Sequence, residues 1–159
     1  MIDLGTEQWF IIVLISFALF VRWILPSKRK RKRRIKLLAK RAQELTPTDF
    51  FELRNFPGKK GKRRCSSEHN FAGVYILYNK TKKMYYVGQA QRVLDRVNSH
   101  FTGKGNGDVY ADYKYGDEFT IRMIGLANSG FRSLNALERY AIDAFKAYPN
   151  GYNRKKGNR

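Results

Sequence analysis

The sequence predicts an α+β domain in the C-terminal half of the chain, and three observations support this prediction. Two short runs rich in aromatic and β-branched residues, 73–79 and 84–88, are typical of strands, and a third run, 119–126, alternates well enough to be another. Two stretches, 91–101 and 133–148, carry apolar residues at helical spacing. A chain of 159 residues has room for one such domain with appended segments.

The first 25 residues differ sharply from the rest. Residues 9–21, WFIIVLISFALFV, contain no charge, and Trp9 and Trp23 lie at the two ends of the apolar stretch, as interfacial anchors do. Arg22 is close enough to the end for its side chain to reach lipid headgroups. We therefore expect a single transmembrane helix within 1–25. A cleaved signal peptide fits less well because the start is acidic, and burial against a protein partner is the other alternative.

Residues 26–69 form a strongly basic segment. Residues 26–64 hold 16 basic and 3 acidic residues, in a chain whose net charge is +19. The run KRKRKRR at 28–34 follows the apolar stretch directly, which places the C-terminal part on the cytoplasmic side of a membrane under the positive-inside rule. Residues 28–45 and 49–56 can form short helices, and 57–64 is a basic, Gly-rich loop. These charges suit anionic lipid or a DNA backbone, and the sequence does not choose between them.

The two strands at 73–79 and 84–88 predict a hairpin that carries a pair of tyrosines. If the hairpin closes with Asn79 opposite Lys82, Tyr75 lies directly opposite Tyr86, and both hydroxyl groups leave the same face of the sheet. A slip of one residue in the register would place them on opposite faces. A tyrosine pair in a strand is compatible with packing alone as well as with function.

The predicted helix 91–101 follows the hairpin and presents a possible phosphate contact. Arg96 and His100 are four residues apart and therefore share one flank of the helix, beside its apolar face. Together they could meet a phosphate, although such residues are also common surface decoration. After this helix, 103–119 reads as a polar loop that begins Gly-rich, and we expect its acidic residues to be solvated: Asp108, Asp112, Asp117 and Glu118.

The last predicted helix, 133–148, places a carboxylate within its apolar face. Glu138 lies four residues after Leu134 and three before Ala141. A carboxylate facing a core is costly unless it is paired or bound to a metal, so Glu138 is either one half of a buried ion pair or a functional group. The single cysteine, Cys65, excludes an internal disulfide framework and offers no zinc-finger spacing.

These positions together resemble the signature of the GIY-YIG nuclease superfamily. GVY at 73–75 and YVG at 86–88 correspond to its paired triplets, with Val in place of Ile at the centre of each. The remaining polar positions of the family pattern match, in chain order, Arg96, His100, Glu138 and Asn153. The resemblance covers about 73–153 and leaves the N-terminal 70 residues outside. It implies a small three-stranded antiparallel sheet flanked by helices within 70–159. The transmembrane segment, 1–25, and the basic linker, 26–69, precede this domain and rest on the sequence pattern alone.

The resemblance also implies hydrolysis of DNA with one divalent metal ion, Mg²⁺ or Mn²⁺, bound by Glu138. Arg96 would contact the scissile phosphate and Tyr75 would act as the general base. The other three positions would support them: Tyr86 by orienting the water or the phosphate, His100 by assisting proton transfer or binding phosphate, and Asn153 by hydrogen bonding. The alternative is a DNA- or lipid-binding module that keeps the fold without turnover.

No module that reads a DNA sequence accompanies the predicted domain. We therefore expect weak sequence preference, or a protein partner that supplies specificity. The sequence indicates no oligomeric state, and double-strand cleavage by an enzyme with one site would need a dimer or two successive nicks.

Overall fold

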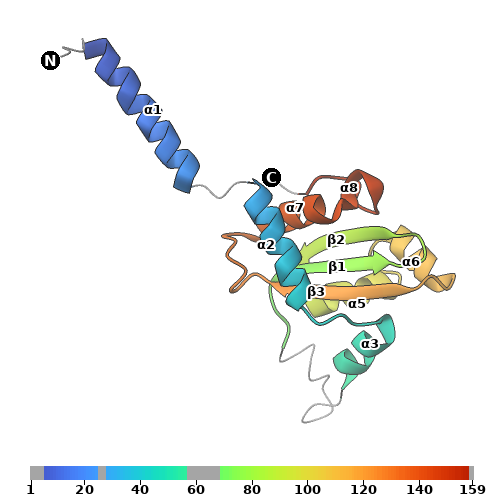
Figure 1. Ribbon diagram of the computed structural model, residues 1–159. Helices are drawn as coiled ribbons and strands as arrows, with labels where there is room; N and C mark the ends of the chain where they lie inside the picture. The colour runs from blue at the N-terminus through green and yellow to red at the C-terminus, as the bar shows by residue number, and fades with distance from the viewer. Residues whose placement is uncertain (1–5, 25–27, 57–68, 158–159) are drawn as a thin grey trace.

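The computed structural model describes residues 6–24, 28–56 and 69–157 (Figure 1). Within them a three-stranded antiparallel sheet has the order β2-β1-β3. Its strands are β1 (Gly73–Asn79), β2 (Met84–Ala90) and β3 (Phe119–Gly125). The expected α+β domain with helices on both sides of this sheet is confirmed.

The sheet separates two apolar layers. Val74, Ile76 and Val87 face α2 (Lys28–Arg41) and α7 (Leu134–Phe145), which cover one side. Tyr75, Leu77 and further core residues face α5 (Val93–Phe101), with α3 (Pro47–Asn55) and α6 (Gly107–Lys114) on the same side. The strand period of two therefore sends alternate residues of β1 into different cores. The short helix α8 (Ala147–Asn150) follows α7.

The segment expected to be a linker contributes two helices to this fold. In α2 the side chains of Ile35 and Ala39 are buried, and α3 buries Phe50. The helix expected over 28–45 ends at Arg41, because Leu45 instead pairs with Ile121 of β3 through two backbone hydrogen bonds of 3.0 and 2.8 Å. Thr46 caps the start of α3. The basic loop at 57–64 lies outside the described residues.

The first helix, α1 (Thr6–Ile24), has exposed apolar side chains over Trp9–Phe17. Among the residues that the structure describes, no helix is both long and apolar enough to cross a membrane. The expected transmembrane helix within 1–25 is therefore not found. Residues 1–5 and 25 of that segment lie outside the described residues.

The loop expected over 103–119 contains a helix, which corrects the sequence interpretation. The side chain of Asn106 accepts a 3.0 Å hydrogen bond from the backbone N–H of Val109 and so caps α6. Val109 is completely buried. The helix starts at a capping asparagine in a glycine-rich stretch. Because α6 has only one deeply buried aliphatic residue, its sequence shows no clear helical period.

Candidate active site

The candidate site begins with Tyr75, which lies in the middle of the sheet. Only 1% of its surface is exposed, and its Oη lies 2.9 Å from Nε2 of His100. The residue opposite Tyr75 on β2 is Gly88. A Cβ built on Gly88 would overlap the Tyr75 hydroxyl group. The glycine that ends the second triplet therefore provides the space that the tyrosine of the first triplet occupies.

The register of the hairpin differs by two residues from the one expected. Asn79 pairs with Met84, and the residue opposite Tyr86 is Leu77 rather than Tyr75. The expectation that the two tyrosines face each other directly is wrong, because the turn spans residues 80–83 and is centred one residue later than expected. The Asn79 side chain accepts a 2.9 Å hydrogen bond from the N–H of Lys82 within that turn.

A shift of two residues leaves the face of the sheet unchanged, so both tyrosines still leave the same side. The ring centroids of Tyr75 and Tyr86 are 6.1 Å apart, and that of Tyr86 lies 4.9 Å from the ring of His100. Burial raises the pKa of Tyr86, and so to a smaller extent does the carboxylate of Glu138. The guanidinium of Arg96 opposes this rise.

His100 is fully buried and has a defined hydrogen-bonding pattern. The backbone N–H of Asn106 donates to Nδ1 over 2.9 Å, so Nδ1 is the acceptor nitrogen. In neutral imidazole the proton then resides on Nε2, which donates to the hydroxyl oxygen of Tyr75. Burial, aided by the charge of Arg96, lowers the pKa of His100 to about 4. His100 is therefore neutral near pH 7, and protein groups occupy both of its ring nitrogens.

Arg96 is exposed on α5, one turn before His100. The pKa of Tyr75 is raised overall, first by burial and then by the neighbouring Tyr86. The guanidinium of Arg96 works in the opposite direction, because its hydrogen bond and its charge both lower the pKa of Tyr75. The same guanidinium also lowers the pKa of Tyr86. Arg96 thus lies beside both phenols and remains open to solvent.

Glu138 approaches the tyrosines from α7. Its side chain lines a cleft of about 250 Å³ together with Tyr86 and Asn153. Glu138 is 8% exposed, and its Oε2 accepts a 3.1 Å hydrogen bond from Nε2 of Gln89. The same Gln89 nitrogen donates a 2.8 Å hydrogen bond to Oδ1 of Asn135, a residue that lies one turn before Glu138 on α7. The Glu138 carboxylate is therefore oriented by an amide and turned toward the cleft.

Asn153 lies against the edge strand of the sheet. Its Oδ1 accepts from the N–H of Val87 over 2.8 Å, and its Nδ2 donates to the carbonyl oxygen of Val87 over 2.7 Å. Val87 stands between Tyr86 and Gly88, so this pair of bonds fixes the second triplet. The neighbouring residue extends the contact, since the N–H of Tyr152 donates to the carbonyl of Tyr85 over 2.9 Å.

The donor groups of the site suit a hard divalent cation with few protein ligands. In the described part of the chain no three His, Cys, Asp or Glu side chains gather into a metal-binding group. Glu138 is the one carboxylate among the described residues that line this open cleft, and Gln89 orients it. Mg²⁺ commonly keeps several waters and binds through one or two carboxylates plus substrate phosphate, so the residues present fit it.

Two acidic residues expected to be solvated are instead part of a structural network. Asp112 accepts a 2.6 Å hydrogen bond from the Tyr152 hydroxyl, and Asp117 accepts a 2.7 Å bond from the buried amide of Asn79. Their side chains are 17% exposed and both pair with Lys82. This network joins the hairpin, α6 and the C-terminal segment at the end of the sheet away from Gly73.

Sequence reasoning missed the groups that hold the six expected side chains. Gln89 directly follows the second triplet, and Asn135 precedes Glu138 by three residues, a helical spacing that could have identified it. The backbone N–H of Asn106 left no signal, because its partner His100 is six residues away across an irregular turn.

Comparison with protein-family models matches residues 71–153 to the GIY-YIG catalytic domain. Comparisons with curated proteins and with solved structures give no match. The matched span contains the three strands, α5 to α8 and all six candidate residues.

Proposed function

Since the chain belongs to the GIY-YIG family, whose members are generally metal-dependent nucleases, we propose that it is an endonuclease that hydrolyses phosphodiester bonds of DNA with one divalent metal ion. The observation that supports this most strongly is the shared cleft of Tyr86, Glu138 and Asn153 beside the exposed Arg96. The site thus combines a carboxylate that can hold a metal ion, a guanidinium that can neutralise charge on a phosphate, and a phenol that can orient water.

Glu138 would hold the ion, Mg²⁺ or Mn²⁺, which when bound supplies positive charge against the phosphate. The protein's own groups then divide the remaining work. Arg96 donates charge-assisted hydrogen bonds to the scissile phosphate, and its exposure allows this contact. Tyr86 orients the attacking water or the phosphate from the wall of the cleft. Asn153 acts indirectly by fixing the backbone of Val87.

Tyr75 is the proposed general base, and His100 assists it. Burial keeps the phenol protonated at rest by raising its pKa, while the N–H of His100 and the guanidinium of Arg96 both favour the phenolate. Tyr75 must first release its own proton to solvent, and the phenolate is then the base. In the reaction the water oxygen bonds to phosphorus, the bond from phosphorus to the leaving oxygen breaks, the water proton passes to the phenolate Oη of Tyr75, and the leaving oxygen takes a proton from solvent. Because both ring nitrogens of His100 are bonded within the protein, we assign it to proton positioning rather than to phosphate binding.

The test is nicking of plasmid DNA by the full chain with Mg²⁺. Glu138→Gln keeps the shape of the side chain and removes its charge, and we expect the nicking rate to fall roughly a hundredfold to a thousandfold or more. Glu118→Gln is the matched control, because Glu118 is an exposed carboxylate outside the cleft. Equal nicking by the two variants would refute the role of Glu138. DNA binding without nicking by the unmutated chain would favour the non-catalytic module.

Attachment to a membrane through α1 is a separate proposal. Its support is the row of exposed apolar side chains over Trp9–Phe17, followed by the basic helix α2, which would hold the domain on the cytoplasmic face. We expect the full chain to sediment with membranes and to resist carbonate extraction. Recovery of the chain in the soluble fraction would reject this proposal.

A further inference from the structure

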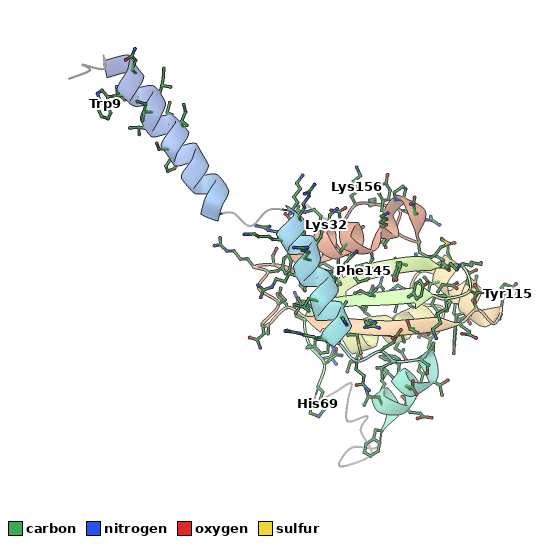
Figure 2. All side chains as sticks on the ribbon, in the orientation of Figure 1. Trp9, Lys32, His69, Tyr115, Phe145 and Lys156 are labelled. Atoms are coloured by element: carbon green, nitrogen blue, oxygen red, sulfur yellow. The ribbon has the colours of Figure 1, made fainter. Side chains whose placement is uncertain are left out.

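A cleft lined by cations lies between α2 and the loop that joins β3 to α7. Six basic side chains line it, and we call it the basic cleft: Lys30, Arg31, Arg33, Arg34, Arg41 and Arg132. Its volume is about 910 Å³, and no acidic residue is among the described residues that line it. Figure 2 shows nitrogen-tipped side chains along the length of α2, with Lys32 labelled. We propose that the basic cleft binds the backbone phosphates of the DNA beside the bond that is cleaved, an inference that rests on the proposed function.

Four of the basic residues of α2 form a stripe. Lys30, Arg33, Arg34 and Arg41 recur at helical spacing, with Leu37 between them, so they project from one side of α2. From residue 30 to residue 41 the helix rises by about 16 Å. One DNA strand carries a phosphate about every 3.4 Å along the duplex axis, so the stripe is long enough to follow about five phosphates.

Two of the arginines hold the cleft in shape. Arg34 donates a 2.5 Å hydrogen bond from Nε to the carbonyl oxygen of Ser129, and its guanidinium fills the space where Gly130 has no side chain. Arg31 donates to the Tyr140 hydroxyl over 3.1 Å and lies 5.0 Å from the centre of that ring. The loop, α2 and α7 are therefore joined, and the cleft exists without a ligand.

The exposed arginines of the cleft favour DNA over a lipid surface. Arg33, Arg41 and Arg132 are exposed around a concave site, whereas a bilayer presents its headgroups in a plane. Five of the six cations are arginines, which bind phosphate oxygens in pairs, so the cleft suits phosphate, and its concave shape is what favours DNA over a bilayer.

The basic cleft lies close to the candidate active site through α7. Ala136 lines the basic cleft and Glu138 lines the candidate active site. Residues two apart project to nearly opposite sides of a helix, so the two clefts lie on either side of α7 at the same level along its axis. DNA held at Glu138 would therefore pass around α7 to reach the basic cleft.

The experiment measures the affinity of the full chain for a labelled DNA duplex by fluorescence anisotropy, at several salt concentrations in a non-ionic detergent without divalent metal. We change Arg33, Arg41 and Arg132 together to Gln, in the Glu138→Gln background so that no cleavage occurs. Each lost phosphate contact lowers the slope of log K against log salt by about 0.9. We expect the slope to fall by about 2 to 3, and the Kd at moderate salt to rise at least about fivefold.

The control removes the same charge elsewhere. Lys80, Lys83 and Lys114 are exposed at or beside the hairpin end of the sheet, and changing them to Gln should lower the slope by less than about 1. Equal effects of the two triple variants, or no effect of either, would overturn the proposal. If the arginine triple variant fails to fold, Arg132→Gln alone replaces it, with an expected fall of about 1.

Vesicles containing anionic lipid provide the second arm. If the arginine triple variant loses binding to these vesicles but keeps the DNA slope, the cleft is a lipid site and the proposal is wrong. Because anisotropy reports binding alone, a chain that never nicks DNA still gives a readable slope. Failure of the proposed function and failure of the DNA cleft are therefore distinguishable.

Discussion

Substitution of Gly88 by Ala tests the packing on which the candidate site depends. The new Cβ would lie 2.5 Å from Cζ of Tyr75 and closer still to its hydroxyl oxygen. Tyr75 is only 1% exposed and bonded to the buried His100, so its ring has little room to move. Overpacking of this kind costs about 1–3 kcal/mol, and loss of the hydrogen bond between Tyr75 and His100 adds about 1 kcal/mol. We therefore expect the free energy of unfolding to fall by about 2–4 kcal/mol.

The assay is urea unfolding of the full chain followed by circular dichroism. Gly107→Ala is the matched control, because a Cβ at Gly107 meets nothing within 4 Å. Tyr75→Phe removes the atom of closest overlap, so Gly88→Ala should cost about 1 kcal/mol less in that background. If Gly88→Ala destabilises the chain no more than Gly107→Ala does, the reasoning about this contact is refuted.

Two further predictions concern the groups around the tyrosines. Because burial lowers the pKa of His100 to about 4, the unfolded chain binds this proton first as the pH falls. The free energy of unfolding should therefore drop by up to about 3 kcal/mol between about pH 6.5 and pH 4, and His100→Gln should remove that part of the slope. An NMR titration that gives His100 a pKa near 6.5 would contradict this. Asn153→Ala leaves both backbone groups of Val87 without their partner and should cost about 1–3 kcal/mol in urea unfolding, with slower nicking. Unchanged stability would show that the edge of β2 does not need this amide.

The sequence predicted the strands, the main helices and the helical face that carries Glu138 because their periodicity is strong. It failed where the local signal is weak. The hairpin loop lacks glycine, so its length could not be read, and the register was displaced by two residues. The tyrosines kept their common face because the strand period is two.

Tertiary contacts explain most of the remaining differences. Leu45 leaves the helical pattern of α2 to pair with Ile121, a partner that is 76 residues away and that local spacing cannot reveal. The environment of Glu138 was anticipated as a choice between an ion pair and a functional role, and one contact observed is with the amide of Gln89, which orients the carboxylate. Gln89 lies on β2, across the packing of α7 on the sheet, so local spacing along α7 could not reveal it.

The central claim is that a divalent ion binds at Glu138 beside the two tyrosines. Paramagnetic broadening of amide NMR signals on addition of Mn²⁺ to the full chain in detergent tests it most directly, without DNA and without turnover. We expect the signals of Tyr86 and Glu138 to broaden first, and Glu138→Gln to abolish the effect. Broadening centred on Asp112 and Asp117, or broadening that persists in Glu138→Gln, would contradict the claim.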